Sequence, residues 1–367
     1  METSNTFRTL TALMRIGILS FNITAGSGQS RFAINLSRGL VKEGKRVTLF
    51  AYYCSSEYFE ILRKYGIEVL AYKSKLNTID IYRSISDSRK VFFEMLKMLK
   101  GAERCDYYLV LSDELVGISK YRNDEKWIYL SNGDLTLLFM NKRFLDEHYP
   151  YSYILKKRFV TQMLKHQKRV AEYDYLFGNS RFAQSIMSFI LNTNFTDYIY
   201  PPVDTDFFRP KFRNGEENYA LVLLRNNSEP MIETIQRIAK AVPIKIVGEA
   251  KVNGAVTLGR ISEDDLVEVY SNATLTIGSS NQEFFGYATA ESLACGTPVI
   301  AFRQGAAVEM IEDNINGWLV QNDRELLNRL DEIFKHEYDK SLRKEARKTS
   351  ERFSIYESSK KFITLIQ

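Results

Sequence analysis

Short runs of apolar residues alternate with amphipathic stretches along this chain of 367 residues. In the first half the runs have the length and composition of β-strands, and they lie at residues 16–21, 46–52, 67–71, 107–111, 127–130 and 175–178. The second half repeats the scheme at 219–224, 244–247, 255–258, 273–277, 298–302 and 317–320. Strands that alternate with helices form parallel sheets covered on both faces. The pattern therefore predicts an α/β protein with two consecutive doubly wound units.

Tandem prolines, Pro201 and Pro202, mark the expected joint between the two units. Proline fixes φ, removes a backbone donor and restricts the preceding residue, so regular structure stops there. We therefore expect an N-terminal domain over residues 1–200 and a C-terminal domain over 201–351. Residues 1–13 are polar and lack the apolar core of a signal peptide, so we expect a loose extension.

The composition limits the function classes. A net charge of +5, from 50 basic and 45 acidic residues, is too mild to indicate a nucleic-acid partner. Three cysteines without metal-ligand spacing favour a reduced, intracellular chain, and three scattered histidines argue against a zinc site. No apolar run approaches 18 residues, so we expect the protein in the cytoplasm or on the cytoplasmic face of a membrane.

Residues 279–301 carry the most specific chemistry. Glu283 and Glu291 stand eight positions apart around a phenylalanine-glycine turn that ends at Gly286. A helix beginning near Tyr287 would direct its N–H groups and the positive end of its dipole at an anionic group such as a phosphate. Glu291, one turn inside that helix, would accept hydrogen bonds from sugar hydroxyls, with Glu283 across the same crevice. A phosphate cradle flanked by two hydroxyl acceptors indicates a nucleotide sugar.

This segment resembles the retaining GT-B glycosyltransferases of the family 4 type (glycosyl transferases group 1), whose signature is two glutamates separated by seven residues. The glycine-threonine-proline continuation at 296–301, Gly305 with Glu309, and the segment 316–320 match the same pattern. The resemblance implies a GT-B fold, in which two Rossmann-like domains face a central cleft. The N-terminal domain would receive the acceptor, and the C-terminal domain would bind the donor. The helical end, 352–367, would pack back onto the N-terminal domain, and no metal would be required.

The resemblance also implies roles for individual residues. Glu291 would bind the ribose hydroxyls and Glu283 the transferred sugar. Charge on the leaving phosphate would be stabilised by Arg225 and by backbone amides of the turn, at Phe285, Gly286, Tyr287 and Ala288. The base would be contacted near Gly248 and Arg260.

The cation for the diphosphate departs from the family pattern. Arg225 follows an apolar strand, and a cation at the carboxyl end of a parallel strand points into the crevice where ligands bind. The family has a glycine before this arginine and a lysine a few residues later. This chain has Leu224 before it and Pro230 and Met231 at the later positions. Arg260 or Lys251 would have to help, or the stabilisation is weaker.

A glycine-rich turn, Gly26-Ser27-Gly28, joins the first strand to an amphipathic helix. Such a turn lets backbone N–H groups approach a phosphate or an acceptor closely. Arg31 stands where a dinucleotide fingerprint would have its third glycine, so a tight structural turn is the alternative. In the GT-B resemblance the loop would face the cleft near the donor diphosphate and the acceptor.

Two further places keep alternatives open. The family often presents a histidine after the strand at 127–130, whereas this chain has Asn132 and Asp134. Either residue would contact the sugar or acceptor, and Asp134 would assist acceptor deprotonation, unless the segment is an ordinary turn. Asp204-Thr205-Asp206 could hold a divalent metal, but its position after the prolines favours a hinge or capping role.

The stretch 141–170 holds eight basic residues interleaved with aromatics. Part of it has helical spacing, which is typical either of a solvated helix against the domain core or of a helix at an anionic membrane surface. The second interpretation would suit a lipid-linked acceptor.

We therefore expect an enzyme that moves a sugar from a UDP- or GDP-sugar to a hydroxyl of a glycan, a lipid-linked molecule or a small molecule. Anomeric configuration would be retained, without a cofactor. The alternatives are a non-catalytic nucleotide-sugar-binding protein of the same fold and a sugar-nucleotide epimerase, which the scarcity of histidines opposes.

Overall fold

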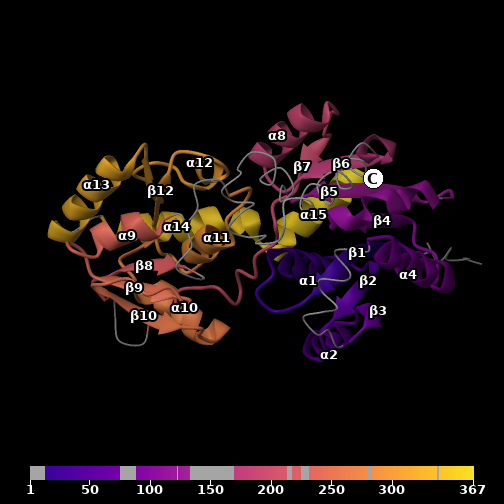
Figure 1. The fold of residues 1–367 in the computed structure, drawn as a ribbon, viewed down its shortest axis with the longest axis horizontal. Coiled ribbons are helices and arrows are strands. Elements are labelled where there is room, and N and C mark those ends of the chain that lie inside the picture. Colours follow the sequence, from indigo (N-terminus) through magenta and orange to yellow (C-terminus); the bar gives the residue numbers. More distant parts are fainter. Residues whose placement is uncertain are drawn as a thin grey trace, which may run out of the picture.

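The structure is a computed structural model, and it describes residues 13–74, 88–121, 123–132, 169–212, 217–224, 231–278, 283–336 and 339–367. Two lobes lie side by side, and each contains one parallel β-sheet with helices packed on it (Figure 1). The first lobe holds the N-terminal strands and the last helix, and the second lobe holds the strands after residue 219.

The N-terminal sheet has the strand order β3-β2-β1-β4-β5-β6-β7, with all neighbours parallel. Its strands are β1 Arg15–Ile23, β2 Arg46–Cys54, β3 Glu68–Lys73, β4 Tyr107–Val110, β5 Lys126–Ser131, β6 Tyr175–Gly178 and β7 Asp197–Tyr198. β1 is central and buried along most of its length, which is why it reads as a continuous apolar run. β7 escapes the sequence pattern because two residues carry no periodicity.

Helices cover both faces of this sheet: α1 Gly28–Lys42, α2 Ser56–Lys64, α4 Ser88–Gly101 and α8 Arg181–Leu191, with the 3-10 turns η1 Asp113–Tyr121 and η2 Val170–Glu172. α1 begins where the side chain of Ser27 accepts the N–H of Ser30. Its apolar stripe of Phe32, Leu36 and Leu40 is buried against one face, and α4 packs against the other.

The C-terminal sheet has the order β10-β9-β8-β11-β12-β13, again parallel throughout. Its strands are β8 Ala220–Leu223, β9 Ile244–Val247, β10 Ala255–Gly259, β11 Leu275–Ile277, β12 Val299–Phe302 and β13 Gly317–Val320. Its helices are α9 Ile232–Ile238, α10 Glu263–Asn272, α11 Tyr287–Ala294, α12 Ala307–Met310, α13 Asp323–Lys335 and α14 Ser341–Ser350. The predicted pair of doubly wound units is confirmed.

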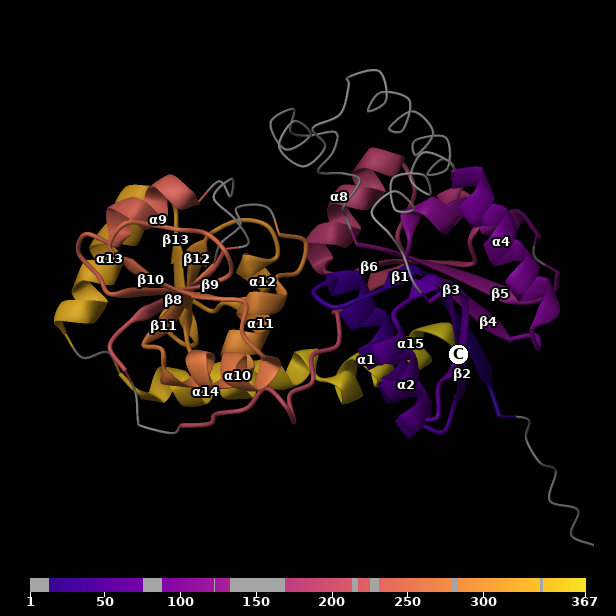
Figure 2. The same ribbon diagram turned by 60° about the horizontal axis from the view of Figure 1, so that its bottom comes forward.

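The chain crosses between the lobes twice, and the two crossings are hydrogen-bonded to each other. The N–H of Val203 donates to the carbonyl of Phe353 at 2.8 Å, and the N–H of Ile355 donates to the carbonyl of Val203 at 3.1 Å. After the turn η3 Glu351–Phe353, helix α15 Ile355–Ile366 lies along α1 (Figure 2). Phe362 and Ile366 share the buried cluster of α1, so the end of the chain belongs to the N-terminal lobe.

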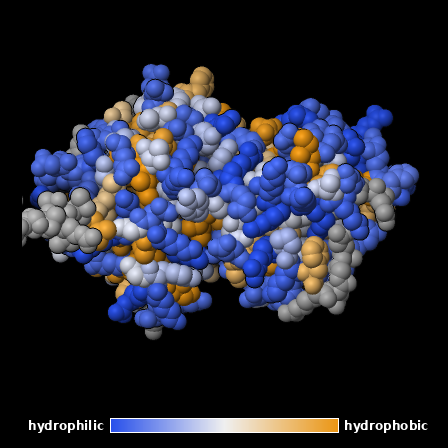
Figure 3. Space-filling view, turned by 180° about the vertical axis from the view of Figure 1, so that it is seen from behind, coloured by the Kyte–Doolittle hydropathy of each residue, from blue (hydrophilic) through white to orange (hydrophobic). Residues whose placement is uncertain are grey.

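Hydrophilic residues cover most of the rear face, with smaller hydrophobic patches between them (Figure 3). Within the described ranges, no helix combines the length and apolarity that a membrane span requires.

Candidate functional site

Each sheet reverses its strand order at one point, between β1 and β4 in the first and between β8 and β11 in the second. Ligands of doubly wound proteins bind beyond the carboxyl ends of the strands at this point. The glycine turn at 24–27 follows β1, and Glu283 with α11 follows β11. The topology therefore places both sequence-predicted loops where ligands bind in folds of this kind.

Gly286 shapes the start of α11. Its φ of 93° lies in the left-handed region that favours glycine. A Cβ at this position would lie 2.5 Å from Oε2 of Glu283 and 3.5 Å from Oγ1 of Thr289. The Glu283 carboxylate thus lies against the first turn of α11, where N–H groups point out of the helix end. Glu283 therefore lies beside the predicted phosphate cradle at the start of α11.

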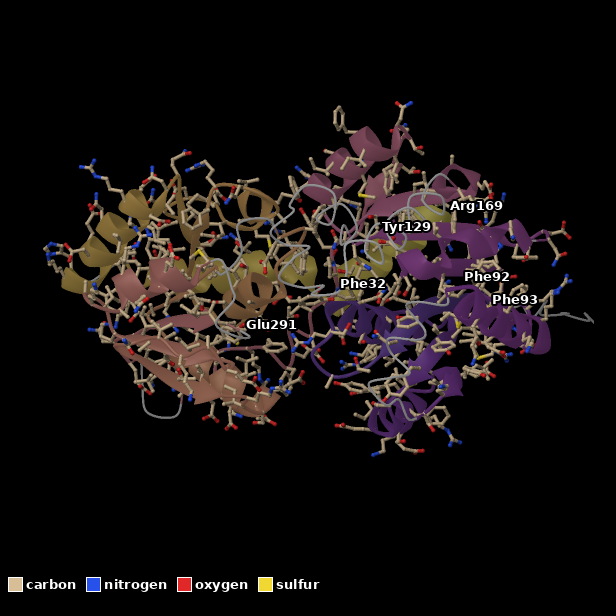
Figure 4. The ribbon with its side chains drawn as sticks, viewed as in Figure 1. Phe32, Phe92, Phe93, Tyr129, Arg169 and Glu291 are labelled. Atoms are coloured by element: carbon tan, nitrogen blue, oxygen red, sulfur yellow. The ribbon has the colours of Figure 1, made fainter. Side chains whose placement is uncertain are left out.

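Glu291 lies one turn further along α11 and is only 2% exposed. Its Oε2 accepts a hydrogen bond from the Tyr270 hydroxyl at 3.3 Å. Its Oε1 forms an ion pair and hydrogen bond with Nη1 of Arg31. Because Arg31 belongs to α1, this pair joins the two domains, and Glu291 lies on the side of its domain that faces α1 (Figure 4).

Arg31 is enclosed by groups of the C-terminal domain. Its Nη2 lies 3.5 Å from Oε1 of Glu263, and its guanidinium carbon lies 5.8 Å from the ring centroid of Tyr287. The Arg31 side chain is 29% exposed, and that of Glu263 is 60% exposed. The buried Glu291 is therefore the stronger partner, since exposed pairs contribute little.

Burial dominates the titration of Glu291. It raises the pKa of the carboxyl from an ordinary 4.5 to about 7, although the Arg31 guanidinium and the Tyr270 hydroxyl act in the opposite direction. Glu291 in turn raises the pKa of Arg31. Burial also holds the pKa of the Tyr270 hydroxyl well above its usual value, so Tyr270 keeps its proton and donates a hydrogen bond to the carboxylate.

The glycine turn is fixed to its own sheet while it faces the other domain. Nε2 of Gln29 donates to the carbonyl of Leu111 at 2.5 Å and to Oγ of Ser112 at 2.7 Å, at the end of β4. A Cβ on Gly28 would lie 3.4 Å from the Tyr287 ring. The start of α1 and the start of α11 thus lie against each other across the two domains.

A second contact between the domains lies beside the first. The Glu309 carboxylate accepts the N–H groups of Arg181 at 3.0 Å and Phe182 at 2.6 Å, the first two residues of α8. The ring of Phe182 lies 5.3 Å from that of Phe284, the neighbour of Glu283. These contacts hold the segment around Phe284 and Glu309 against the N-terminal domain.

The Phe285 side chain is a core residue. It is buried, and its ring lies 6.1 Å from Tyr200, 5.6 Å from Phe353 and 5.3 Å from Tyr287. This aromatic cluster anchors the turn to both crossings between the lobes. The backbone of Phe285, rather than its ring, is the part available to a ligand.

The residues predicted to lie near the base form a separate group. The N–H of Gly248 donates to the carbonyl of Gly259 at 2.9 Å. Arg260 pairs with Glu249 at 2.9 Å, and its side chain is 85% exposed. An arginine so exposed is a poor candidate for the diphosphate cation.

The other predicted residues divide into two groups. Arg225, Asp134 and residues 141–168 of the basic segment lie outside the described residues. Asn132 is described, and its Nδ2 donates to the carbonyl of Leu111 at 2.9 Å, the acceptor that also receives Gln29.

Asp204 forms contacts next to the crossing between the lobes at Val203. Its carboxylate pairs with Arg38 at 2.7 Å and accepts the N–H of Phe207 at 3.1 Å. Across the parts of the chain that the structure describes, no three potential metal ligands come together.

Sequence reasoning missed Arg31, Tyr270 and Glu263 as members of the site. The position of Arg31 could have suggested a role in the site, because it lies in the first turn of α1, just after the glycine loop. Nothing in the sequence indicates that a residue 260 positions away, Glu291, is its partner.

Comparison with solved structures defines the class of fold as GT-B. The chain is similar to a sucrose-phosphate synthase from Thermosynechococcus elongatus, with a TM-score of 0.75 and 15% identity over 96% of this chain and 98% of that one. It is also similar to the Anabaena protein HepE in complex with UDP-glucose, with a TM-score of 0.70 and 15% identity over 96% and 99%. The predicted pair of Rossmann-like domains is confirmed.

Sequence comparison finds a family match within the C-terminal domain. Residues 244–352, which include β9 to α14, match the family glycosyl transferases group 1. A stretch of 57 residues is 49% identical to D-inositol 3-phosphate glycosyltransferase of Acidothermus cellulolyticus. That stretch is 16% of this chain and 13% of the relative. The comparisons thus show a GT-B fold for the chain and a match to glycosyl transferases group 1 for part of its C-terminal domain.

Proposed function

We propose that this protein transfers a sugar from a nucleotide diphosphate sugar, linked to UDP or GDP, to an acceptor hydroxyl with retention of anomeric configuration. One observation carries the proposal: the start of α11 faces the glycine turn of the other domain, with Glu283 beside it and Glu291 one turn later. The similarity to a protein that was solved with UDP-glucose supports a donor of this kind.

The diphosphate would bind at the start of α11. Backbone N–H groups between Phe285 and Ala288 and the positive end of the helix dipole favour negative charge there. Charge grows on the leaving phosphate in the transition state, so donors that are already in position lower the barrier. We keep Arg225 as a further cation and Asp134 as an aid to acceptor deprotonation.

The two glutamates would bind different parts of the donor. Glu291 would accept hydrogen bonds from the ribose, and Glu283, at the mouth of the helix end, from the transferred sugar. The acceptor would approach from the N-terminal domain past Gly26, Ser27 and Gly28. Contact between the domains would exclude water, which otherwise takes the sugar in place of the acceptor.

Release of nucleoside diphosphate from a panel of UDP- and GDP-sugars tests the proposal. We expect Glu291→Ala to raise KM for the donor and Glu283→Ala mainly to lower kcat. Glu332→Ala, which removes an exposed glutamate of α13 that pairs with Arg329, is the matched control and should leave both constants unchanged. Wild-type kinetics in both site variants would contradict the assignment.

A nucleotide-sugar-binding protein without transferase activity is the second candidate. Two departures from the family pattern favour it. Pro230 and Met231 stand where the family has a lysine, and Asn132 follows the strand after which the family often has a histidine. This second candidate predicts donor binding without release of nucleoside diphosphate, with or without acceptors, in the same assay.

A further inference from the structure

The Arg31 guanidinium is a charged group that the N-terminal domain contributes to the predicted donor site. It leaves α1, crosses the boundary between the domains and ends between Glu291 and Glu263, beside the Tyr287 ring. In this conformation it covers the carboxylate to which we assign the ribose. A donor can therefore bind Glu291 only when Arg31 moves.

The place to which Arg31 can move is one helical turn away. Tyr287 begins α11, and Glu291 follows four residues later on the same face of the helix. Four residues rise by about 6 Å along a helix, a distance that a change of rotamers in a long arginine side chain can span. The first turn of α11 is also where the diphosphate would bind, and the guanidinium already lies 5.8 Å from the Tyr287 ring.

The charges favour such an exchange. A buried carboxylate that loses its cation is destabilising unless other donors replace it. The ribose supplies hydroxyl donors to Glu291, and the linked diphosphate supplies negative charge for the arginine. One ligand thus satisfies both members of the broken ion pair, with the Tyr270 hydroxyl still in place.

We propose that Arg31 is the diphosphate-binding cation delivered by the N-terminal domain, and that Glu291 holds it in the donor-free protein. This inference rests on the proposed donor site and adds to it a residue from the opposite domain. Arg31 would supply a cation in place of the lysine that the family has and this chain lacks, since the Arg260 side chain is 85% exposed. It also links donor binding to contact between the domains.

A simpler role for Arg31 makes the opposite prediction. If Arg31 only holds the domains together, it competes with the ribose for Glu291. Its removal would then free the carboxylate and tighten the binding of every nucleotide, whatever the number of phosphates. The dependence of affinity on phosphate number therefore separates the two roles.

The experiment measures binding of nucleoside, nucleoside monophosphate and nucleoside diphosphate by calorimetry, in the uridine and guanosine series. The proteins are wild type, Arg31→Gln, Arg31→Lys and Arg38→Gln. Arg38 is the matched control: it lies two turns later in α1 and pairs with Asp204 at the hinge, away from Glu291. Circular dichroism confirms that each variant is folded.

We expect Arg31→Gln to weaken diphosphate binding by about 10- to 100-fold, as for a lost hydrogen bond between charged groups. The monophosphate should lose less, the nucleoside should lose nothing, and Arg31→Lys should recover part of the diphosphate affinity. Arg38→Gln should bind like wild type. Equal or tighter diphosphate binding by Arg31→Gln overturns the proposal but leaves the donor site intact. Failure of wild type to bind either series overturns the donor site and this proposal with it.

Discussion

Replacing Glu291 by glutamine should change how the stability of the C-terminal domain depends on pH. Burial raises the pKa of this carboxyl from 4.5 to about 7 in the folded protein. The folded state therefore holds the proton more tightly than the unfolded state between these two values. The contribution of Glu291 to the free energy of unfolding is fully present below pH 4.5 and is lost as the pH rises through about 7.

The size of the effect follows from the two pKa values. The difference between 4.5 and about 7 corresponds to about 3 kcal/mol of free energy of unfolding. Glutamine has nearly the same shape and does not titrate. Wild type should therefore lose about 3 kcal/mol relative to Glu291→Gln when the pH rises from 4.5 to 8.

Denaturant unfolding followed by tryptophan fluorescence measures this difference. The chain has two tryptophans, and Trp318 is 4% exposed in β13 of the domain that contains Glu291. A Trp127→Phe background in both proteins leaves Trp318 as the reporter. The reasoning would be refuted if the difference in free energy of unfolding between the two proteins stayed constant with pH, or if wild type became relatively more stable at high pH. The Arg31 ion pair would then outweigh burial and hold the pKa of Glu291 low.

Three further predictions concern the site and its supports. Gly286→Ala should destabilise the fold by about 1–2 kcal/mol through left-handed strain and lower kcat about 100-fold through displacement of Glu283. Gly44→Ala, at a φ of 72° and with no atom of the described residues within 4 Å of the added Cβ, should leave kcat unchanged. Equal kcat losses in both variants would contradict the geometry. Glu309→Gln should weaken the cap on α8, so that hydrogen exchange at the Phe182 amide speeds up; an unchanged rate would show that the interdomain bond is unimportant. Transferase activity should persist in EDTA, and a loss reversed by magnesium or manganese would assign a metal to the aspartates at 204–206.

Local periodicity explains why most strands could be predicted. The strands at 175–178, 244–247 and 317–320 have the bounds expected from their apolar runs. The others differ by one to two residues at one or both ends. Some ladders continue beyond the apolar run, as in β1 and β2, whereas β8 and β11 are shorter than their runs. The start of α11 at Tyr287 was predicted from the glycine turn, and the positive φ of Gly286 is its physical reason.

The contacts between the domains could not be predicted in this way. Arg31 and Glu291, or Glu309 and the start of α8, come together only when two separately folded sheets meet. The sequence around either residue of such a pair does not indicate which residue is its partner. The expectation that Glu291 is open to sugar hydroxyls was therefore incomplete, because its pairing with an arginine of the other domain depends on the tertiary structure.

The most direct test of the donor site is the thermal stability of wild type and Glu291→Ala with UDP-, GDP-, ADP- and dTDP-sugars. A ligand at about 100 times its dissociation constant adds about 2.7 kcal/mol to the folded state. Our account predicts a rise in Tm with sugars of one base, and a loss of that rise in the variant. No rise with any donor, or the same rise in Glu291→Ala, would contradict it.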